Sequence, residues 1–165
     1  WTVCRELSCR MLMLAGIGDK DECGRLVDEA VESGEALKRF EMMVKLQGGD
    51  VSYIEDTSKF RKASFSREVY APADGYITHT DSEKIGLITV LLGAGREKKD
   101  DDINHAAGII IAAKTGDFVK RGELLATLLA DDESRLDGAE SRYLSAVSIG
   151  DKKPAEQPMI LDYID

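Results

Sequence analysis

The sequence lacks the features of a membrane protein and of a nucleic-acid-binding protein. No apolar run approaches the roughly 18 residues that a membrane-spanning helix needs, and no signal-peptide pattern is visible. The formal net charge is -9, so there is no excess of positive charge to attract nucleic acid or an acidic membrane. We therefore expect a cytoplasmic protein with neither a membrane nor a nucleic-acid partner.

Cysteine and histidine are also scarce, which argues against a metal centre or a disulfide framework. Cys4, Cys9 and Cys23 are odd in number and do not have the Cys-x-x-Cys spacing typical of zinc sites. His79 and His105 have no Cys, Asp or Glu at ligand spacing on the same element. We expect three reduced thiols, no metal ion and no cofactor.

What the sequence does contain is enough apolar material for about one domain, or for one domain and a fragment of another. The chain has 165 residues, of which 43% are hydrophobic and 32% are charged. It begins Trp1-Thr2-Val3, without an initiating Met and already inside a helical pattern. We expect it to be the C-terminal piece of a longer protein.

Three amphipathic helices are predicted in residues 1–50. Apolar residues recur at helical spacing over about 3–15, after Asp19 and over about 37–44. Asp19 is a predicted N-cap with Glu22 three residues later, and Gly34 suits the left-handed position that ends the second helix. These helices either form a small bundle or pack on a sheet that this chain lacks, and the start of the chain favours the second arrangement.

A linker over residues 51–64 and a C-terminal domain over residues 65–165 are expected next. The linker is polar and mixed, and from residue 65 the apolar period changes to two. Strands are predicted at about 66–71 and 75–80, with turn residues between them. Two short apolar runs at 108–113 and 124–130 are predicted to be buried strands, and 159–164, which follow Pro158, to be an edge strand.

Two further helices are predicted in this domain. Asp81-Ser82 begins the first, which Gly93 ends, and the second covers about 136–147. The segment from about Asp81 to Gly108 would be an insertion between the two halves of a small barrel-sandwich module. The predicted fold class is therefore α+β, with a barrel-sandwich-like C-terminal domain preceded by three helices.

No catalytic, cofactor-binding or metal-binding residue is predicted from the spacing of chemical groups. Gly93-x-Gly95 follows a helix instead of preceding one, so no helix N-terminus would face a phosphate there. The run at 100–102 lacks the alternating ligands of a calcium loop. No nucleophile with a neighbouring base and no pair of buried carboxylates is indicated.

Gly93, Gly95 and Arg96 are the residues for which we expect a role, as parts of an interdomain loop. The charged stretch 95–102 has no apolar residue to anchor it, so we expect mobility. The planar guanidinium of Arg96 is suited to hold a carboxylate or several carbonyls. Whether Arg96 contacts another domain or only ties down its own loop stays open from the sequence.

Four segments, 85–86, 91–96, 102–109 and 116–126, come in an order and at separations that resemble the C-terminal domain of pyrimidine-nucleoside phosphorylases, the thymidine phosphorylase family. Upstream, residues 14–15, the second helix and 46–50 look like the last helices of that family's α/β domain and the joint after them. The resemblance implies an α/β-hammerhead C-terminal domain. It also implies a homodimeric cytosolic pentosyltransferase that splits pyrimidine nucleosides with phosphate into base and (deoxy)ribose 1-phosphate.

The same resemblance implies that the substrate site lies elsewhere. In that family the residues that hold phosphate, base and sugar precede the region matched here, so none is assigned to this chain. Phosphate and the pyrimidine nucleoside would bind outside it, its partner would be the upstream part of the same enzyme, and the 165-residue chain alone would be inactive. Dimer contacts in the family come mostly from upstream helices.

Two alternatives remain from other functional classes. Biotinyl and lipoyl carrier modules share the patterns at 69–75 and 116–125, but they attach their group to a lysine at a hairpin tip, and residues 130–133 read Ala-Asp-Asp-Glu. The second alternative is a regulatory or interaction domain with the same fold, because a fold alone does not decide function.

Overall fold

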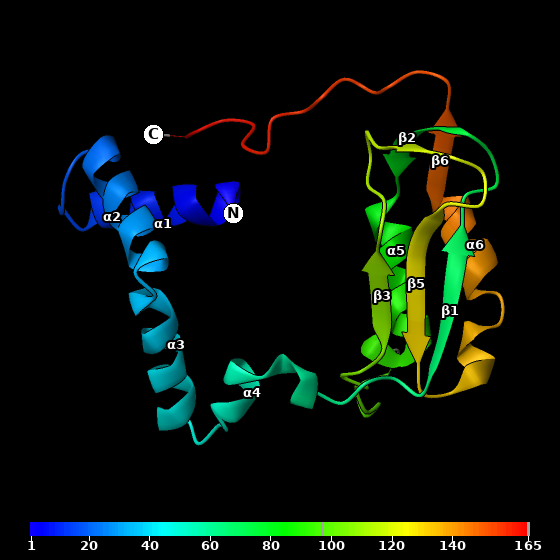
Figure 1. The fold of residues 1–165 in the computed structure, drawn as a ribbon, viewed down its shortest axis with the longest axis horizontal. Coiled ribbons are helices and arrows are strands. Elements are labelled where there is room, and N and C mark those ends of the chain that lie inside the picture. Colours follow the sequence, from blue (N-terminus) through cyan, green and yellow to red (C-terminus); the bar gives the residue numbers. More distant parts are fainter. Residues whose placement is uncertain (97, 165) are drawn as a thin grey trace. The chain divides into compact units, whose positions relative to one another are not determined.

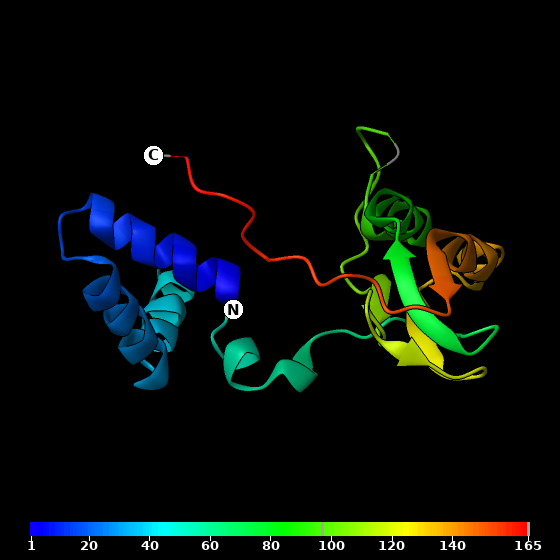
Figure 2. The ribbon, with the colours of Figure 1, turned by 90° about the horizontal axis from the view of Figure 1, so that it is seen from above.

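The computed structural model describes residues 1–96 and 98–164. The chain divides into two compact units, one formed by Trp1–Phe60 with the stretch from Gln157 onward and the other by Arg61–Glu156. We call them the helical unit and the sheet unit. Helices and two small antiparallel sheets occur in one chain, which confirms the predicted α+β class (Figures 1 and 2).

The helical unit is built from three regular helices and a short irregular stretch. Its elements are α1 (Thr2–Leu14), α2 (Lys20–Glu32), α3 (Glu35–Leu46), α4 (Ser52–Glu55) and the 3-10 turn η1 (Thr57–Lys59). The sequence signals for their ends are confirmed. Asp19 Oδ1 accepts a hydrogen bond from the Glu22 amide at 2.9 Å, and Gly34 has the left-handed φ of 77° between α2 and α3.

Burial in the helical unit is limited. Among its described apolar side chains only Cys9, Cys23 and Val27 are buried, all at the contact of α1 with α2. The same two helices are joined by Arg5, whose Nε and Nη2 donate to the two carboxylate oxygens of Asp28 at 2.7 and 2.6 Å. Most apolar side chains of these helices therefore remain exposed.

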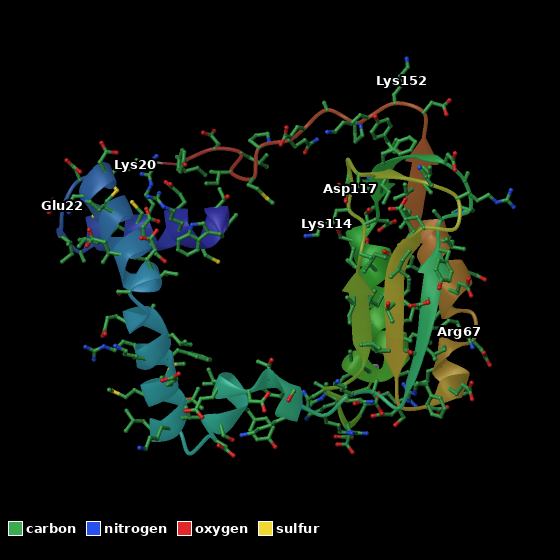
Figure 3. The ribbon with its side chains drawn as sticks, viewed as in Figure 1. Lys20, Glu22, Arg67, Lys114, Asp117 and Lys152 are labelled. Carbon is green, nitrogen blue, oxygen red and sulfur yellow. The ribbon has the colours of Figure 1, made fainter. Side chains whose placement is uncertain are left out.

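The described residues of the sheet unit form six strands in two antiparallel sheets. The strands are β1 (Phe65–Tyr70), β2 (Gly75–Thr80), β3 (Gly108–Ile111), β4 (Phe118–Val119), β5 (Leu124–Ala130) and β6 (Val147–Gly150). One sheet has the order β1-β5-β3 and the other β4-β2-β6. Figure 1 shows β5 between β1 and β3. A turn whose Asp117 Oδ2 accepts from the Lys114 amide at 2.8 Å precedes β4 (Figure 3).

Helices complete the sheet unit and close its core. They are α5 (Ser82–Thr89), the π-helical turn η2 (Val90–Ala94), the 3-10 turn η3 (Glu133–Leu136) and α6 (Ala139–Ala146). Asp81 caps α5 as predicted, accepting from the Lys84 amide at 3.1 Å. Buried side chains of both sheets and both helices form one cluster that includes Val69, Ile77, Ile88, Leu128 and Tyr143.

One prediction about the C-terminal part is wrong, and another is confirmed over a shorter span. Residues 159–164 form no strand; Tyr163 instead lies on the helical unit, with the Arg10 guanidinium 4.3 Å from its ring centre. The helix predicted over about 136–147 is present as α6 over Ala139–Ala146, and Val147 instead begins β6, where it pairs with Thr80 of β2. Pairing with the edge of β2 overrides the helical periodicity at this point.

Candidate functional site

A pocket of about 740 Å³ opens on the sheet unit where α5 ends. Its lining comes from η2, from the loop that follows and from the segment after β5, and it includes Leu91, Gly93, Gly95, Asn104, Asp131 and Arg135. Both charge signs are present, together with the apolar side chains of η2. The lining is therefore suited to a polar group and not to a purely apolar ligand.

Two of the three predicted loop residues line this pocket. Gly93 is buried with a left-handed φ of 104°, which disfavours a side chain at this position. At Gly95 an added Cβ would come within 2.7 Å of Val90 Cγ2, so the close approach of the loop to η2 requires glycine. The turn η2 is assigned through Ala94, but the φ of Gly93 is not helical, so the helical backbone is interrupted at Gly93 as predicted.

Arg96 lies just outside the pocket lining and is exposed. No hydrogen bond or ion pair joins its side chain to any other residue that the structure describes. The predicted loop 95–102 also includes residue 97, which lies outside the described residues. Farther along, the Lys98 amide donates to Asp101 Oδ2 at 2.8 Å, which closes a local turn at the pocket edge.

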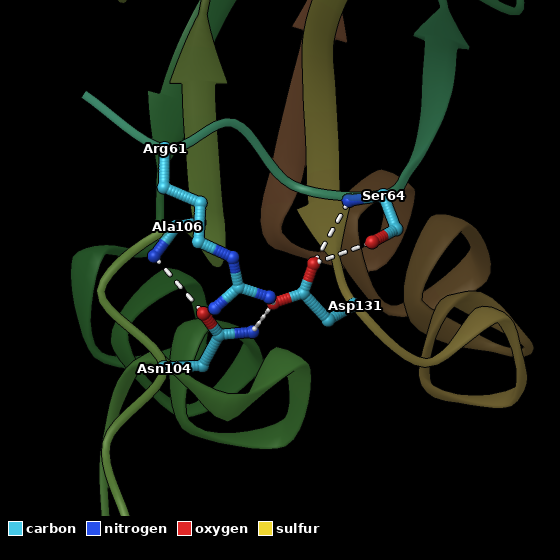
Figure 4. A network of polar contacts seen from close by, with 5 residues as sticks. All are labelled: Arg61, Ser64, Asn104, Ala106 and Asp131. Carbon is cyan, nitrogen blue, oxygen red and sulfur yellow. Dashed lines mark hydrogen bonds and ion pairs between the residues drawn. The ribbon is translucent and has the colours of Figure 1, made fainter. Parts of the chain in front are cut away.

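Asp131 lines the pocket, and both of its carboxylate oxygens accept hydrogen bonds from neighbouring residues (Figure 4). Oδ1 accepts from the amide and the hydroxyl of Ser64, each at 2.9 Å. Oδ2 accepts from Asn104 Nδ2 at 2.7 Å and from Arg61. The pKa of Asp131 is lowered, first by the Ser64 amide and hydroxyl and then by Asn104 and the charge of Arg61, so the carboxylate stays ionised at neutral pH.

This network could not be predicted from the sequence. Its members Ser64 and Asn104 are 67 and 27 residues from Asp131. In the sequence, Asp131 is notable only because it stands where a carrier module would have its lysine. A hydrogen-bonded network of this kind is visible only once β1 and β5 are paired, because the register places Phe65 opposite Ala130.

Two other residues of the pocket lining, Arg135 and Asp132, also make hydrogen bonds to lining residues. Arg135 Nη1 donates to the Leu91 carbonyl at 3.2 Å, and Asp132 Oδ1 accepts from the amide and hydroxyl of Ser134 at 3.0 and 2.7 Å. The polar side chains of the lining are therefore held in place partly by hydrogen bonds to other lining residues. Among its described lining residues there is no cysteine or histidine, and the hydroxyl of Ser134 is held in the local turn by Asp132.

Metal ligation and membrane insertion find no support in the described parts of the chain. No group of three His, Cys, Asp or Glu residues there is placed to hold a metal ion. His105 is exposed in the turn before β3, and His79 is exposed on β2. None of the helices described is both long enough and apolar enough to cross a bilayer.

Comparison with known proteins places most of the sheet unit in one family. Residues 76–150 match the family described as Pyrimidine nucleoside phosphorylase C-terminal domain. The chain is similar to the pyrimidine-nucleoside phosphorylase of Bacillus subtilis (strain 168), with 39% identity over 129 residues, which cover 78% of this chain and 30% of the relative. It is similar to those of Staphylococcus aureus strains bovine RF122 / ET3-1 and USA300, with 36% identity over 146 residues, which cover 88% of this chain and 34% of each relative. The chain spans about a third of the length of these curated relatives.

Proposed function

Because this chain belongs to the pyrimidine-nucleoside phosphorylase family and carries that family's C-terminal domain, we propose that it is the C-terminal part of a phosphorolytic enzyme. The complete enzyme would split pyrimidine nucleosides with inorganic phosphate into the free base and (deoxy)ribose 1-phosphate. It would therefore act as a pentosyltransferase. The observation that carries the proposal is the family match over 76–150, which spans most of the sheet unit.

Within that enzyme the helical unit would join this part to the preceding part of the same chain. Exposed large apolar side chains recur along all three of its regular helices, among them Leu7, Met11, Leu14, Leu37, Phe40 and Leu46. Apolar surface of this extent is typical of a protein interface. We expect residues upstream of Trp1 to cover it, and we propose a cytoplasmic homodimer as the assembled form.

The sheet unit would supply an α/β-hammerhead domain that moves as the substrate cleft closes. Arg96 is exposed beside the pocket, and Gly93 and Gly95 shape the loop before it. An arginine without a described partner is available to a carboxylate or to carbonyl groups of the other domain. Closure of this kind excludes water and completes the site in many enzymes.

The carrier alternative has little support from the geometry. The segment after β5 contains Asp131, which is bound to Ser64 and Asn104, and then the turn η3. No lysine lies at this place in the sequence. A mass shift of the purified chain matching a biotin or lipoyl group would revive this alternative.

The direct test exchanges the matching part of a relative for this chain. In the pyrimidine-nucleoside phosphorylase of Bacillus subtilis, the region aligned with this chain is replaced by residues 1–165, and release of free base from thymidine and uridine is measured with phosphate present. We expect an active chimera, and no base release from the 165-residue chain alone. A folded chimera without activity would contradict the proposal, as would base release by the isolated chain.

The loop proposal is tested in the same chimera with Arg96→Ala. We expect turnover to fall while the melting temperature stays the same, because the contact is made only in the closed enzyme. Lys99→Ala is the matched control, since it removes an exposed positive charge from the same loop. Unchanged turnover with a lower melting temperature would mean that Arg96 only ties down its own loop.

A further inference from the structure

Asp131 connects two segments of the sheet unit that are far apart in sequence. One is residues 61–64, and the other is the Asn104 turn, which we define as residues 104–107. One carboxylate serves both segments, with Ser64 bound to Oδ1 and Asn104 bound to Oδ2 (Figure 4). A displacement of either segment therefore strains or breaks bonds to the group that holds the other.

The Asn104 turn continues this connection to the pocket. Asn104 uses both ends of its side-chain amide, because Nδ2 donates to Asp131 and Oδ1 accepts from the Ala106 amide at 3.0 Å. Its backbone amide donates to the carbonyl of Gly93 at 2.9 Å. Rotation of the Asn104 side chain would break the bonds to Asp131 and Ala106 together, so the turn has little freedom to move alone.

Residues 61–64 are the first part of the sheet unit along the chain. The chain passes between the two compact units at two places, and the first of them lies between Phe60 and Arg61. A change in the direction of the chain at this connection must therefore act on 61–64 before any other part of the sheet unit. In the ion pair of Arg61 with Asp131, the arginine side chain is 70% exposed and the aspartate side chain is 21% exposed. Solvent screens the Arg61 pair, so the Ser64 contacts matter more.

We infer that Asp131 is a positioning residue that couples the connection between the units to the pocket edge. Through it, the placement of residues 61–64 and that of Asn104 and Gly93 stabilise each other. Such coupling is reciprocal, so loosening either segment must loosen the other by the same free energy. The inference concerns contacts within the sheet unit and does not depend on the proposed reaction.

Hydrogen exchange of backbone amides in the 165-residue chain tests this coupling. In Ser64→Ala, which removes one donor to Asp131 and touches nothing at the turn, we expect the amides of Asn104, Ala106 and Ala107 to exchange roughly 5-fold faster or more. Their acceptors are Gly93 O, Asn104 Oδ1 and Asn104 O. In Asn104→Ala we expect the Ser64 amide, which donates to Asp131 Oδ1, to exchange faster by a similar factor.

Asp132→Asn is the matched control. Asp132 is next to Asp131, lines the same pocket and carries the same charge, but it binds Ser134 instead of either segment. Asn keeps the side-chain oxygen that accepts from Ser134, so we expect at most slightly faster exchange at Ser134 and no change at Ser64 or in the Asn104 turn. The amides of β5 report that the core stays folded in each variant. Unchanged exchange in the turn of Ser64→Ala, or an equal acceleration there in Asp132→Asn, would overturn the inference.

Discussion

The two compact units bury their apolar side chains to very different extents. In the sheet unit both sheets and both helices contribute to one buried cluster, with Val69, Leu92 and Leu128 fully inaccessible. In the helical unit burial is confined to the contact of α1 with α2, while Leu14 and Leu46 are 89% and 81% exposed. Apolar burial is the main favourable term in folding, so the sheet unit has its own source of stability and the helical unit has little.

The comparison shows that a clear amphipathic pattern does not by itself mean a buried face. Helix α2 and helix α5 both begin at an aspartate cap, at Asp19 and Asp81. Ile85 and Ile88 of α5 pack into the core of the sheet unit, whereas Val31 of α2 is exposed. The pattern is set by the surroundings of a helix in the complete protein, and for α1–α3 we propose that those surroundings lie upstream.

The largest expected effect is the loss of stability caused by a substitution in the core of the sheet unit. Leu128→Ala removes a fully buried side chain at the centre of β5 and should lower the free energy of unfolding by about 2–5 kcal/mol. Leu46→Ala removes the same atoms from an exposed position in α3 and should change it by less than about 0.5 kcal/mol. Urea unfolding followed by far-ultraviolet circular dichroism measures both. The only tryptophan, Trp1, lies in the helical unit and does not report on β5. Equal losses in the two variants would remove the contrast between the units.

Local signals in the sequence were sufficient for much of the fold. The caps at Asp19 and Asp81 and the left-handed Gly34 depend on residues a few positions apart, and all three are present in the structure. The strands at 65–70, 75–80 and 124–130 follow from their alternating or continuous apolar pattern. These features are decided within a few turns of chain, so one sequence is enough to find them.

Features that depend on distant pairing were not predictable in this way. Residues 147–150 are a strand because the edge of β2 is available to them, although their apolar spacing continues that of α6. Tyr163 lies against the charged side chains of Arg10 and Lys20. The apolar run at 159–164, from which a strand is predicted, contains no information about these contacts. Gly93 and Gly95, which the sequence singles out for another reason, line the pocket, whereas the contacts of Asp131 to Ser64 and Asn104 have no local signal in the sequence.

A smaller effect depends on pH and should again distinguish the stability of the helical unit from that of the sheet unit. The hydrogen bonds that Arg5 donates, together with the positive charge of its guanidinium, lower the pKa of Asp28 in the folded protein. The ionised carboxylate therefore stabilises the α1–α2 contact above the unfolded pKa of about 3.9, and this contribution is lost as the pH falls below that value through the folded pKa. Segment-resolved NMR during acid titration should show α1 and α2 separating before the core of the sheet unit changes.

Two variants check the origin of this titration. Asp28→Asn should weaken the α1–α2 contact at neutral pH and flatten its acid dependence. Glu29→Gln is the matched control, because Glu29 pairs with Arg25 at 3.6 Å with both side chains more than half exposed. We expect that variant to titrate like the unaltered chain. An identical acid profile in Asp28→Asn would exclude the Arg5 pair as the cause.

The smallest expected effect is at the helix caps. Asp81→Ala removes the acceptor of the Lys84 amide and should lower the stability of the sheet unit by about 1 kcal/mol. Asp19→Ala removes the equivalent acceptor in α2, and we expect faster amide exchange in the first turn of α2 with no change in β5. Asp→Asn at either position retains a cap and should be nearly neutral. A loss of protection in β5 after Asp19→Ala would show that the units unfold as one.

The self-sufficiency of the sheet unit is tested most directly by expressing residues 61–156 alone and measuring thermal unfolding by circular dichroism. These residues contain the whole buried cluster of both sheets and of α5 and α6. We expect one cooperative transition, close in midpoint to that of the sheet unit in the 165-residue chain. A product that binds hydrophobic dye and melts without a cooperative transition would contradict the account, because the sheet unit would then depend on residues 1–60.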